Sequence, residues 1–146
     1  MKILFVCTGN TCRSPMAQAL FAEEAKKRGL DCECRSAGIA TFTGNPASDN
    51  AVAVMKEIGI DLSGFRSTNI RSILSDMYDL YVPMTYTHAR ALLDLGIPKR
   101  KIYLFDSDVT DPYGGSIDFY RRTRDELSRN IKKLADFAEE QIGGAE

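Results

Sequence analysis

The sequence predicts an α/β domain built on a parallel β-sheet with helices on its faces. Two observations support this fold class. Short apolar runs alternate along the chain with segments whose apolar residues recur every three or four positions, as in β-α-β units. The first run, KILFVC at residues 2–7, is apolar almost throughout, which is typical of a strand buried on both faces. The 146 residues fit a single domain, residues 1–146, with a core of its own.

Each element is expected where its pattern begins and ends. Pro15 suits the first turn of a helix, Gly29 suits its end, and the alternation of the second strand breaks at Gly38. The expected strands are residues 2–7, 31–36, 77–84 and 101–105. The expected helices are residues 14–28, 47–58, 88–95 and 117–138.

Composition and cysteine spacing narrow the classes of protein. The formal net charge is -1 and the first apolar run is too short to cross a bilayer, so we expect no nucleic-acid or membrane partner and a cytoplasmic location. The four cysteines, at positions 7, 12, 32 and 34, are not spaced as zinc ligands, and the single histidine, His88, lies far along the chain. Reduced thiols and no bound metal are therefore expected.

The segment between the first strand and the first helix has the features of an anion-binding loop. Gly9 permits backbone conformations closed to other residues, and Asn10 tolerates the left-handed region. A tight turn that leads into a helix places successive N–H groups around one point, where the helix dipole also favours negative charge. Ligands of α/β sheets are expected at this end of the strands. The pattern therefore predicts a phosphate site.

Three side chains near this loop suit phosphate chemistry. Cys7 would lie at its floor, where the helix dipole and a guanidinium favour a nucleophilic thiolate. Arg13 can offer two N–H groups to two phosphate oxygens, and Ser14 can donate to the sulfur. The alternative is a buried strand cysteine, a surface arginine and an ordinary helix start. Their spacing between a strand and a helix favours the functional interpretation.

CTGNTCRSP at residues 7–15, together with DPYGG at residues 111–115, resembles the low-molecular-weight protein phosphatase family. The resemblance implies a three-layer, flavodoxin-like fold with a four-stranded parallel sheet, no metal and no other cofactor. It also implies a two-step reaction through a cysteinyl phosphate. In that reaction Cys7 is the nucleophile, Arg13 the phosphate clamp and Asp111 the general acid.

The resemblance also assigns supporting roles. Asn10, Ser14 and Ser36 would support the loop and the thiolate. Independently of the resemblance, Cys12 is the expected redox partner of Cys7, because a low-pKa thiol with a neighbouring cysteine can form a reversible disulfide that protects it from over-oxidation. The expected substrate-binding residues are Thr8, Gly9, Asn10, Thr11, Cys12, Ser14 and Tyr113.

The residues by themselves leave the general acid open. DPYG also spells a type I β-turn. Without the family resemblance, the pattern does not separate four candidate carboxylates, which are Asp106, Asp108, Asp111 and Asp118.

Thr11 bears on which phosphorylated residue is cleaved. Tyrosine phosphatases of this family usually have an aliphatic residue at this position, whereas CTGNTCRSP with DPYGGS looks like the bacterial branch that acts on protein phosphoarginine. A guanidinium can use the hydroxyl, stack on Tyr113 and be held by Asp111. Phosphoarginine in proteins is the favoured substrate, and phosphotyrosine in proteins is the alternative. The plain alternative for Thr11 is that it only fills space.

Two other classes share parts of this pattern. A thiol-dependent arsenate reductase with this fold relays oxidation through cysteines late in the chain, and this sequence has none after Cys34. A phospho-residue reader or a phosphocarrier would bind phosphate without repeated turnover. We expect phosphorylated proteins as partners, inorganic phosphate as product and a monomeric protein. His88 is interpreted as an ordinary helix residue.

Overall fold

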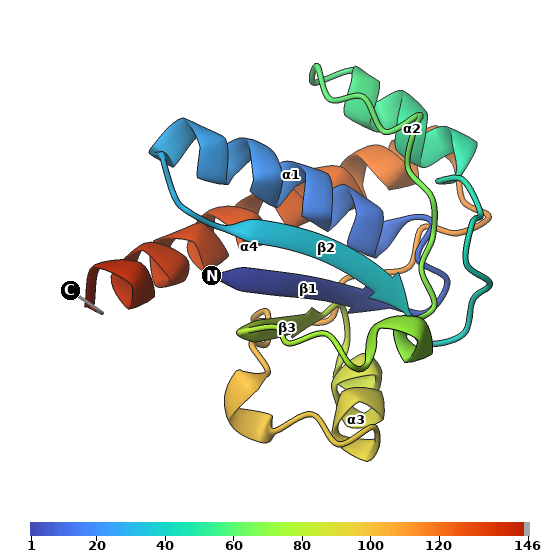
Figure 1. The fold of residues 1–146 in the computed structure, drawn as a ribbon. Coiled ribbons are helices and arrows are strands. Elements are labelled where there is room, and N and C mark those ends of the chain that lie inside the picture. The colour runs from blue at the N-terminus through green and yellow to red at the C-terminus, as the bar shows by residue number, and fades with distance from the viewer. Residues whose placement is uncertain (145–146) are drawn as a thin grey trace.

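Three parallel strands form the sheet of the computed structural model, which describes residues 1–144. Their order is β2-β1-β3, so the first strand of the chain lies in the middle. The strands are β1 (Lys2–Cys7), β2 (Glu33–Gly38) and β3 (Leu80–Pro83). Helices cover both faces of this sheet (Figure 1). The predicted fold class, a parallel sheet flanked by helices, is confirmed.

Four α-helices and two short 3-10 helices surround the sheet within residues 1–144. Three of them, α1 (Arg13–Arg28), α2 (Asp49–Lys56) and α4 (Ile117–Gly144), lie on one side (Figure 1). The other side carries α3 (Tyr86–Asp94) and the 3-10 segments Ile70–Ile73 and Lys99–Lys101.

The central strand explains why both faces need cover. Every residue of β1 after Lys2 is buried. Phe5 belongs to the core under α1 and α4, whereas Leu4 and Val6 belong to a second core on the side of α3. Because successive side chains of a strand point to opposite faces, a continuously apolar strand requires helices on both sides.

The expected fourth strand is wrong as a strand. Residues 101–105 touch the sheet through a single parallel bridge between Tyr81 and Ile102 and one hydrogen bond from Tyr103 N to Tyr81 O. The rings of Tyr103 and Phe137 pack together instead, with centroids 5.1 Å apart. The apolar residues of this segment therefore cover the open edge of β3 and contact α4, so the sheet has three strands rather than four.

Several element boundaries differ from the predicted ones because polar caps set them. α2 begins at Asp49 rather than at residue 47, since the Ser48 side chain accepts a hydrogen bond from Ala51 N. α3 begins at Tyr86 rather than at residue 88, since Thr85 caps its first turn. The predicted boundaries rest on the spacing of apolar residues, which does not register a capping side chain.

A close backbone approach at Gly38 brings β2 against the loop that follows β1. A Cβ atom at Gly38 would lie 2.6 Å from the carbonyl oxygen of Thr8 and 3.0 Å from Cβ of Asn10. The next two residues donate backbone hydrogen bonds to Cys7 O and Thr8 O. Glycine at this position therefore lets β2 support the loop directly.

Candidate active site

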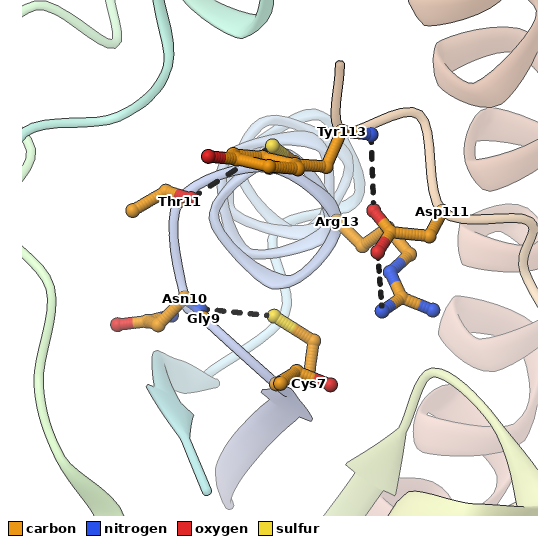
Figure 2. Close-up of a pocket in the computed structure, with 9 residues that line it drawn as sticks. Cys7, Gly9, Asn10, Thr11, Arg13, Asp111 and Tyr113 are labelled. Carbon is orange, nitrogen blue, oxygen red and sulfur yellow. Dashed lines mark hydrogen bonds and ion pairs between the residues drawn. The ribbon is translucent and has the colours of Figure 1, made fainter. Parts of the chain in front are cut away.

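A cavity of about 220 Å³ opens at the carboxyl end of β1 (Figure 2). It is lined by Cys7, Thr8, Gly9, Asn10, Thr11, Cys12, Arg13, Asp111 and Tyr113. The structure thus brings together most of the residues singled out in the sequence. Ser14 and Ser36, which the sequence also singled out, are buried and lie within one hydrogen bond of Asn10.

Asn10 gives the loop its shape. It has a φ of 54° and is the one non-glycine residue with a positive φ among residues 1–144. Gly9 does not adopt a positive φ, so the conformational freedom expected at Gly9 is used at Asn10 instead. Asparagine is one of the few residues that tolerate this region, because its short polar side chain bonds nearby groups.

The fully buried Asn10 side chain joins three parts of the chain. Its Oδ1 accepts a hydrogen bond from Thr68 N at 2.8 Å. Its Nδ2 lies 2.8 Å from Ser14 Oγ and 3.0 Å from Ser36 Oγ. The loop, α1, β2 and the segment before the Ile70–Ile73 turn are therefore held in one hydrogen-bonded group.

The Cys7 thiol lies under the loop. Its Sγ is 2.8 Å from Ser14 Oγ and accepts a hydrogen bond from Asn10 N at 3.2 Å. Burial raises the pKa of the Cys7 thiol above its ordinary value, while the bonds from Ser14 and Asn10 and the charge of Arg13 act to lower that pKa. The sequence-based expectation of a thiolate weighed only the stabilising groups, and burial of the sulfur opposes it.

The start of α1 offers further donors to an anion. Cys12 stands at its N-cap position and makes no side-chain cap hydrogen bond. The first N–H groups of a helix have no partner within the helix. In α1 these N–H groups lie at the end of the helix that borders the cavity, since Cys12 and Arg13 are among the cavity residues. The positive end of the helix dipole also favours an anion at this place.

Arg13 links the loop to the segment that carries Asp111. Its guanidinium donates a hydrogen bond to Val109 O at 3.1 Å, and its NH2 lies 3.6 Å from Asp111 Oδ2. The Arg13 side chain is 7% exposed and the Asp111 side chain 53% exposed. Asp111 also accepts a hydrogen bond from Tyr113 N at 3.1 Å. Figure 2 shows Arg13 and Asp111 on one side of the cavity, with the ring of Tyr113 extending from that side toward Thr11.

The interpretation of His88 as an ordinary helix residue is incomplete. It is buried, and its ring nitrogens lie 2.8 Å from Thr8 Oγ1 and 2.9 Å from Thr85 Oγ1. Burial, followed by the charge of Arg13, lowers the pKa of His88 to about 4. A neutral imidazole therefore ties the loop to the first turn of α3. The only local sign of this role in the sequence is that His88 stands three residues after Thr85, a residue type that caps helices.

Cys12 contacts two hydroxyl groups that the sequence did not single out. Its Sγ lies 3.3 Å from Ser48 Oγ and 3.3 Å from Tyr120 OH. Burial raises the pKa of Tyr120 to about 12. Ser48 N also donates a hydrogen bond to Thr11 O at 2.9 Å, so α2 supports the outer part of the loop. All four cysteines are free thiols.

Two features are absent from residues 1–144, the part of the chain that the structure describes. No group of three or more His, Cys, Asp and Glu side chains in this part of the chain is arranged to hold a metal ion. None of the helices in the same residues is both long enough and apolar enough to cross a membrane.

Comparison with known proteins places this geometry in a family. Residues 2–143 match the family described as low molecular weight phosphotyrosine protein phosphatase. The chain belongs to this family. It is 40% identical over 143 residues to a protein-arginine-phosphatase of Bacillus subtilis (strain 168), covering 92% of this chain and 95% of the relative. A protein-arginine-phosphatase of Geobacillus stearothermophilus is also 40% identical, over 92% of this chain and 94% of the relative.

A solved structure of a relative has the same fold. The YwlE arginine phosphatase, as a C7S mutant with a phosphorylated active site serine, superposes with a TM-score of 0.90 at 38% identity. The match covers 95% of this chain and 96% of that one. The relatives also include tyrosine phosphatases and arsenate reductases.

Proposed function

We propose that the protein is a cysteine-dependent phosphatase that removes the phosphoryl group from phosphoarginine in proteins. The observation that carries the proposal is the single cavity in which Cys7, Arg13 and Asp111 meet. A nucleophile, a phosphate-binding guanidinium and an acid are the groups that a two-step phosphoryl transfer requires.

In the first step the Cys7 sulfur attacks phosphorus. The new S–P bond forms as the P–N bond to the substrate guanidine breaks. Asp111 gives its proton to the departing nitrogen, which leaves as a neutral guanidine and is then protonated by water. A positioned acid of this kind contributes about 10²- to 10⁴-fold to the rate.

In the second step water attacks the cysteinyl phosphate. The Asp111 carboxylate takes a proton from this water as the O–P bond forms. The S–P bond breaks, phosphate leaves and the Cys7 thiolate is restored. The Ser14 hydroxyl, 2.8 Å from Sγ, stabilises that sulfur both as attacking group and as leaving group.

Charge on the transferred group is stabilised by the loop. The phosphoryl oxygens gain negative charge along the reaction, and donors that are already in place cost no reorganisation. The first N–H groups of α1 and the Arg13 fork are such donors. Arg13 is held in position by Val109 O and by the Asp111 carboxylate.

Thr11 and Tyr113 support a guanidinium substrate. Both line the cavity, and the Tyr113 side chain is largely exposed at its mouth (Figure 2). The planar guanidinium of arginine can stack on the tyrosine ring, and its N–H groups can bond the Thr11 hydroxyl. The two relatives described above are protein-arginine phosphatases. Phosphotyrosine remains the second candidate, because the family is described by that activity.

We propose further that the protein acts as a monomer in the reducing environment of the cytoplasm. The nucleophile has to be a free thiol, and every group proposed above comes from one chain.

We also propose Cys12 as the redox partner of Cys7. Peroxide would oxidise the Cys7 thiolate to a sulfenic acid, and the Cys12 thiol would condense with it and release water. Dithiothreitol should restore activity after peroxide in the wild type but not in Cys12→Ser, and equal recovery in both would exclude this role.

Substrate preference is tested with matched phosphoarginine and phosphotyrosine peptides. For the wild type we expect the larger kcat/KM on phosphoarginine. Thr11→Ile should shift the ratio toward phosphotyrosine by about 10-fold or more, because a lost buried hydrogen bond costs on the order of 1 to 3 kcal/mol. Thr11→Ser keeps the hydroxyl and should keep the wild-type preference. A preference for phosphotyrosine in the wild type would overturn the arginine assignment.

A further inference from the structure

The hydrogen bonds behind Cys7 continue beyond the residues that touch the loop. Ser36 Oγ, in β2, donates to Gln18 Oε1, in α1, at 2.6 Å. Gln18 lines no part of the cavity and is partly buried. It is nevertheless connected to the nucleophile by a continuous chain, which runs from Gln18 through Ser36, Asn10 and Ser14 to Cys7.

The direction of the two bonds from the Asn10 amide nitrogen is fixed by one backbone group. Thr68 N can only donate, so the atom of Asn10 that it contacts at 2.8 Å is the amide oxygen. The amide nitrogen therefore faces Ser14 and Ser36 and gives one hydrogen to each. Both serine oxygens thus act as acceptors toward Asn10.

Each serine has one hydrogen left to give. Ser36 gives its hydrogen to Gln18 Oε1, and Ser14 is left to donate to the Cys7 sulfur. No buried side-chain nitrogen or oxygen within residues 1–144 lacks a hydrogen-bond partner, so the amide and hydroxyl groups of Asn10, Ser14 and Ser36 are all paired. The hydrogen that stabilises a negative sulfur is therefore directed by a sequence of bonds that ends at Gln18.

We propose that Gln18 is a positioning residue for the reaction of Cys7, because it is the terminal acceptor that keeps the Ser14 hydrogen directed at the sulfur. This proposal rests on the phosphatase function proposed above. Without an acceptor at position 18, the Ser36 hydroxyl loses the bond that fixes its orientation, and its oxygen is no longer held in place to accept from Asn10 Nδ2. The amide then no longer holds both serines as acceptors, and the Ser14 hydroxyl is free to turn away from Cys7.

Gln18 provides this acceptor without a charge. A glutamate of the same length accepts the same bond but adds a negative charge that opposes a thiolate. Methionine is similar in length and has no strong acceptor. The three side chains therefore separate the effect of the acceptor from the effects of length and charge.

The test measures the ionisation of Cys7 directly. The rate of alkylation by iodoacetamide is followed against pH, and modification at Cys7 is distinguished from that at Cys12 by fragmentation of the peptide that contains both. In Gln18→Met we expect the midpoint to rise by about one pH unit, a roughly 10-fold smaller thiolate fraction at a fixed pH. Gln18→Glu should stay closer to the wild type than Gln18→Met does, because it keeps the acceptor.

The neighbouring groups are the same in all variants. Arg13, Asp111 and His88, which surround the cavity and its loop, stay unchanged, so a shift reports the Ser14 bond. Equal Tm values for the variants exclude a general loosening, and Gln18→Leu carries the same expectation as Gln18→Met. A wild-type midpoint in both apolar variants would overturn the proposal. Alkylation needs no phosphorylated substrate, so the result stands apart from the outcome of the peptide assays.

Discussion

The two sides of the cavity are built in different ways. On the side of the Cys7–Ser14 loop, Asn10 and Ser14 are fully buried and share a closed set of hydrogen bonds. On the other side, Asp111 is half exposed and Tyr113 is 77% exposed. Two contacts hold the Asp111 carboxylate in place. One is the 3.6 Å ion pair with Arg13, and the other is the hydrogen bond that Tyr113 N donates to Asp111 Oδ1.

This difference separates binding from proton transfer. The loop is set by the folded core, so its donors need no rearrangement when phosphate arrives. Asp111 is exposed enough to exchange protons with water and to meet a protein substrate. Changes on the loop side should therefore affect both activity and stability, whereas changes on the acid side should affect activity alone.

The largest effect is expected from Asp111→Asn. It removes the proton donor, so kcat on a phosphoarginine peptide should fall by about 10²- to 10⁴-fold. The Tm should stay near that of the wild type, because an exposed ion pair contributes little to stability. The fall in kcat/KM, which reports only the steps up to departure of the leaving group, should be much smaller on p-nitrophenyl phosphate than on the peptide, because its leaving group needs little protonation.

Asp106→Asn is the matched control. Asp106 lies in the same connecting segment, outside the cavity, and pairs with Lys133 at 2.6 Å. This variant should retain wild-type kcat. Equal losses of kcat/KM in Asp111→Asn on both substrates would contradict the role of Asp111 as general acid.

A change at Asn10 should lower both activity and stability. Asn10→Ala removes three side-chain hydrogen bonds and places alanine at a φ of 54°. The free energy of unfolding in urea should fall by about 2 to 4 kcal/mol, and kcat/KM by about 10- to 100-fold. Asn10→Gly relieves the backbone strain and leaves the bonds missing, so it should recover part of the stability and little of the activity. Full recovery of activity in Asn10→Gly would show that the side-chain bonds are not needed.

The smallest effect is expected from the protonation of His88. Its pKa is about 4 in the folded protein and about 6.5 in the unfolded chain. Below pH 6.5 the unfolded state binds a proton that the folded state does not, so stability is present above this pH and is lost as the pH falls toward 4. Between pH 7 and pH 5 the free energy of unfolding should fall by about 1 to 2 kcal/mol.

His88→Gln provides the comparison for this effect. Glutamine keeps a donor and an acceptor for Thr8 and Thr85 but does not titrate. Its free energy of unfolding should change less between pH 7 and pH 5 than that of the wild type. An equal loss in both proteins would assign the pH dependence to other groups.

The loop side of the site is also the side that the sequence predicted best. A strand, a turn and a helix start follow each other within a few residues, so Cys7, Arg13 and Ser14 are placed by local rules. Asp111 comes from a segment almost a hundred residues away, and only the family resemblance separated it from its neighbours. The prediction of a fourth strand rests on the local apolar character of residues 101–105. In the structure this segment does not form a strand, and the Tyr103 ring packs against Phe137 of α4.

The supporting contacts behind the loop lay beyond local reasoning. The His88 ring contacts the Thr8 hydroxyl although the two residues are 80 positions apart in the sequence. The Tyr120 hydroxyl contacts the Cys12 sulfur although these residues are 108 positions apart. Such pairs depend on the packing of α3 and α4, which periodicity does not fix. Gln18 is nearer to Ser36 in the chain, but their bond requires the register of α1 on β2. The sequence therefore predicts the reacting groups better than the groups that orient them.

The central claim is that Cys7 carries the phosphoryl group during the reaction. It is tested by mixing Asp111→Asn, in which loss of the general base slows the second step, with p-nitrophenyl phosphate, whose leaving group needs little protonation in the first step, and quenching within milliseconds for mass spectrometry. We expect the phosphoryl group on Cys7, and neither a modified residue nor phosphate release in Cys7→Ala. Phosphate release by Cys7→Ala at the wild-type rate, or a phosphoryl group on another residue, would contradict this account.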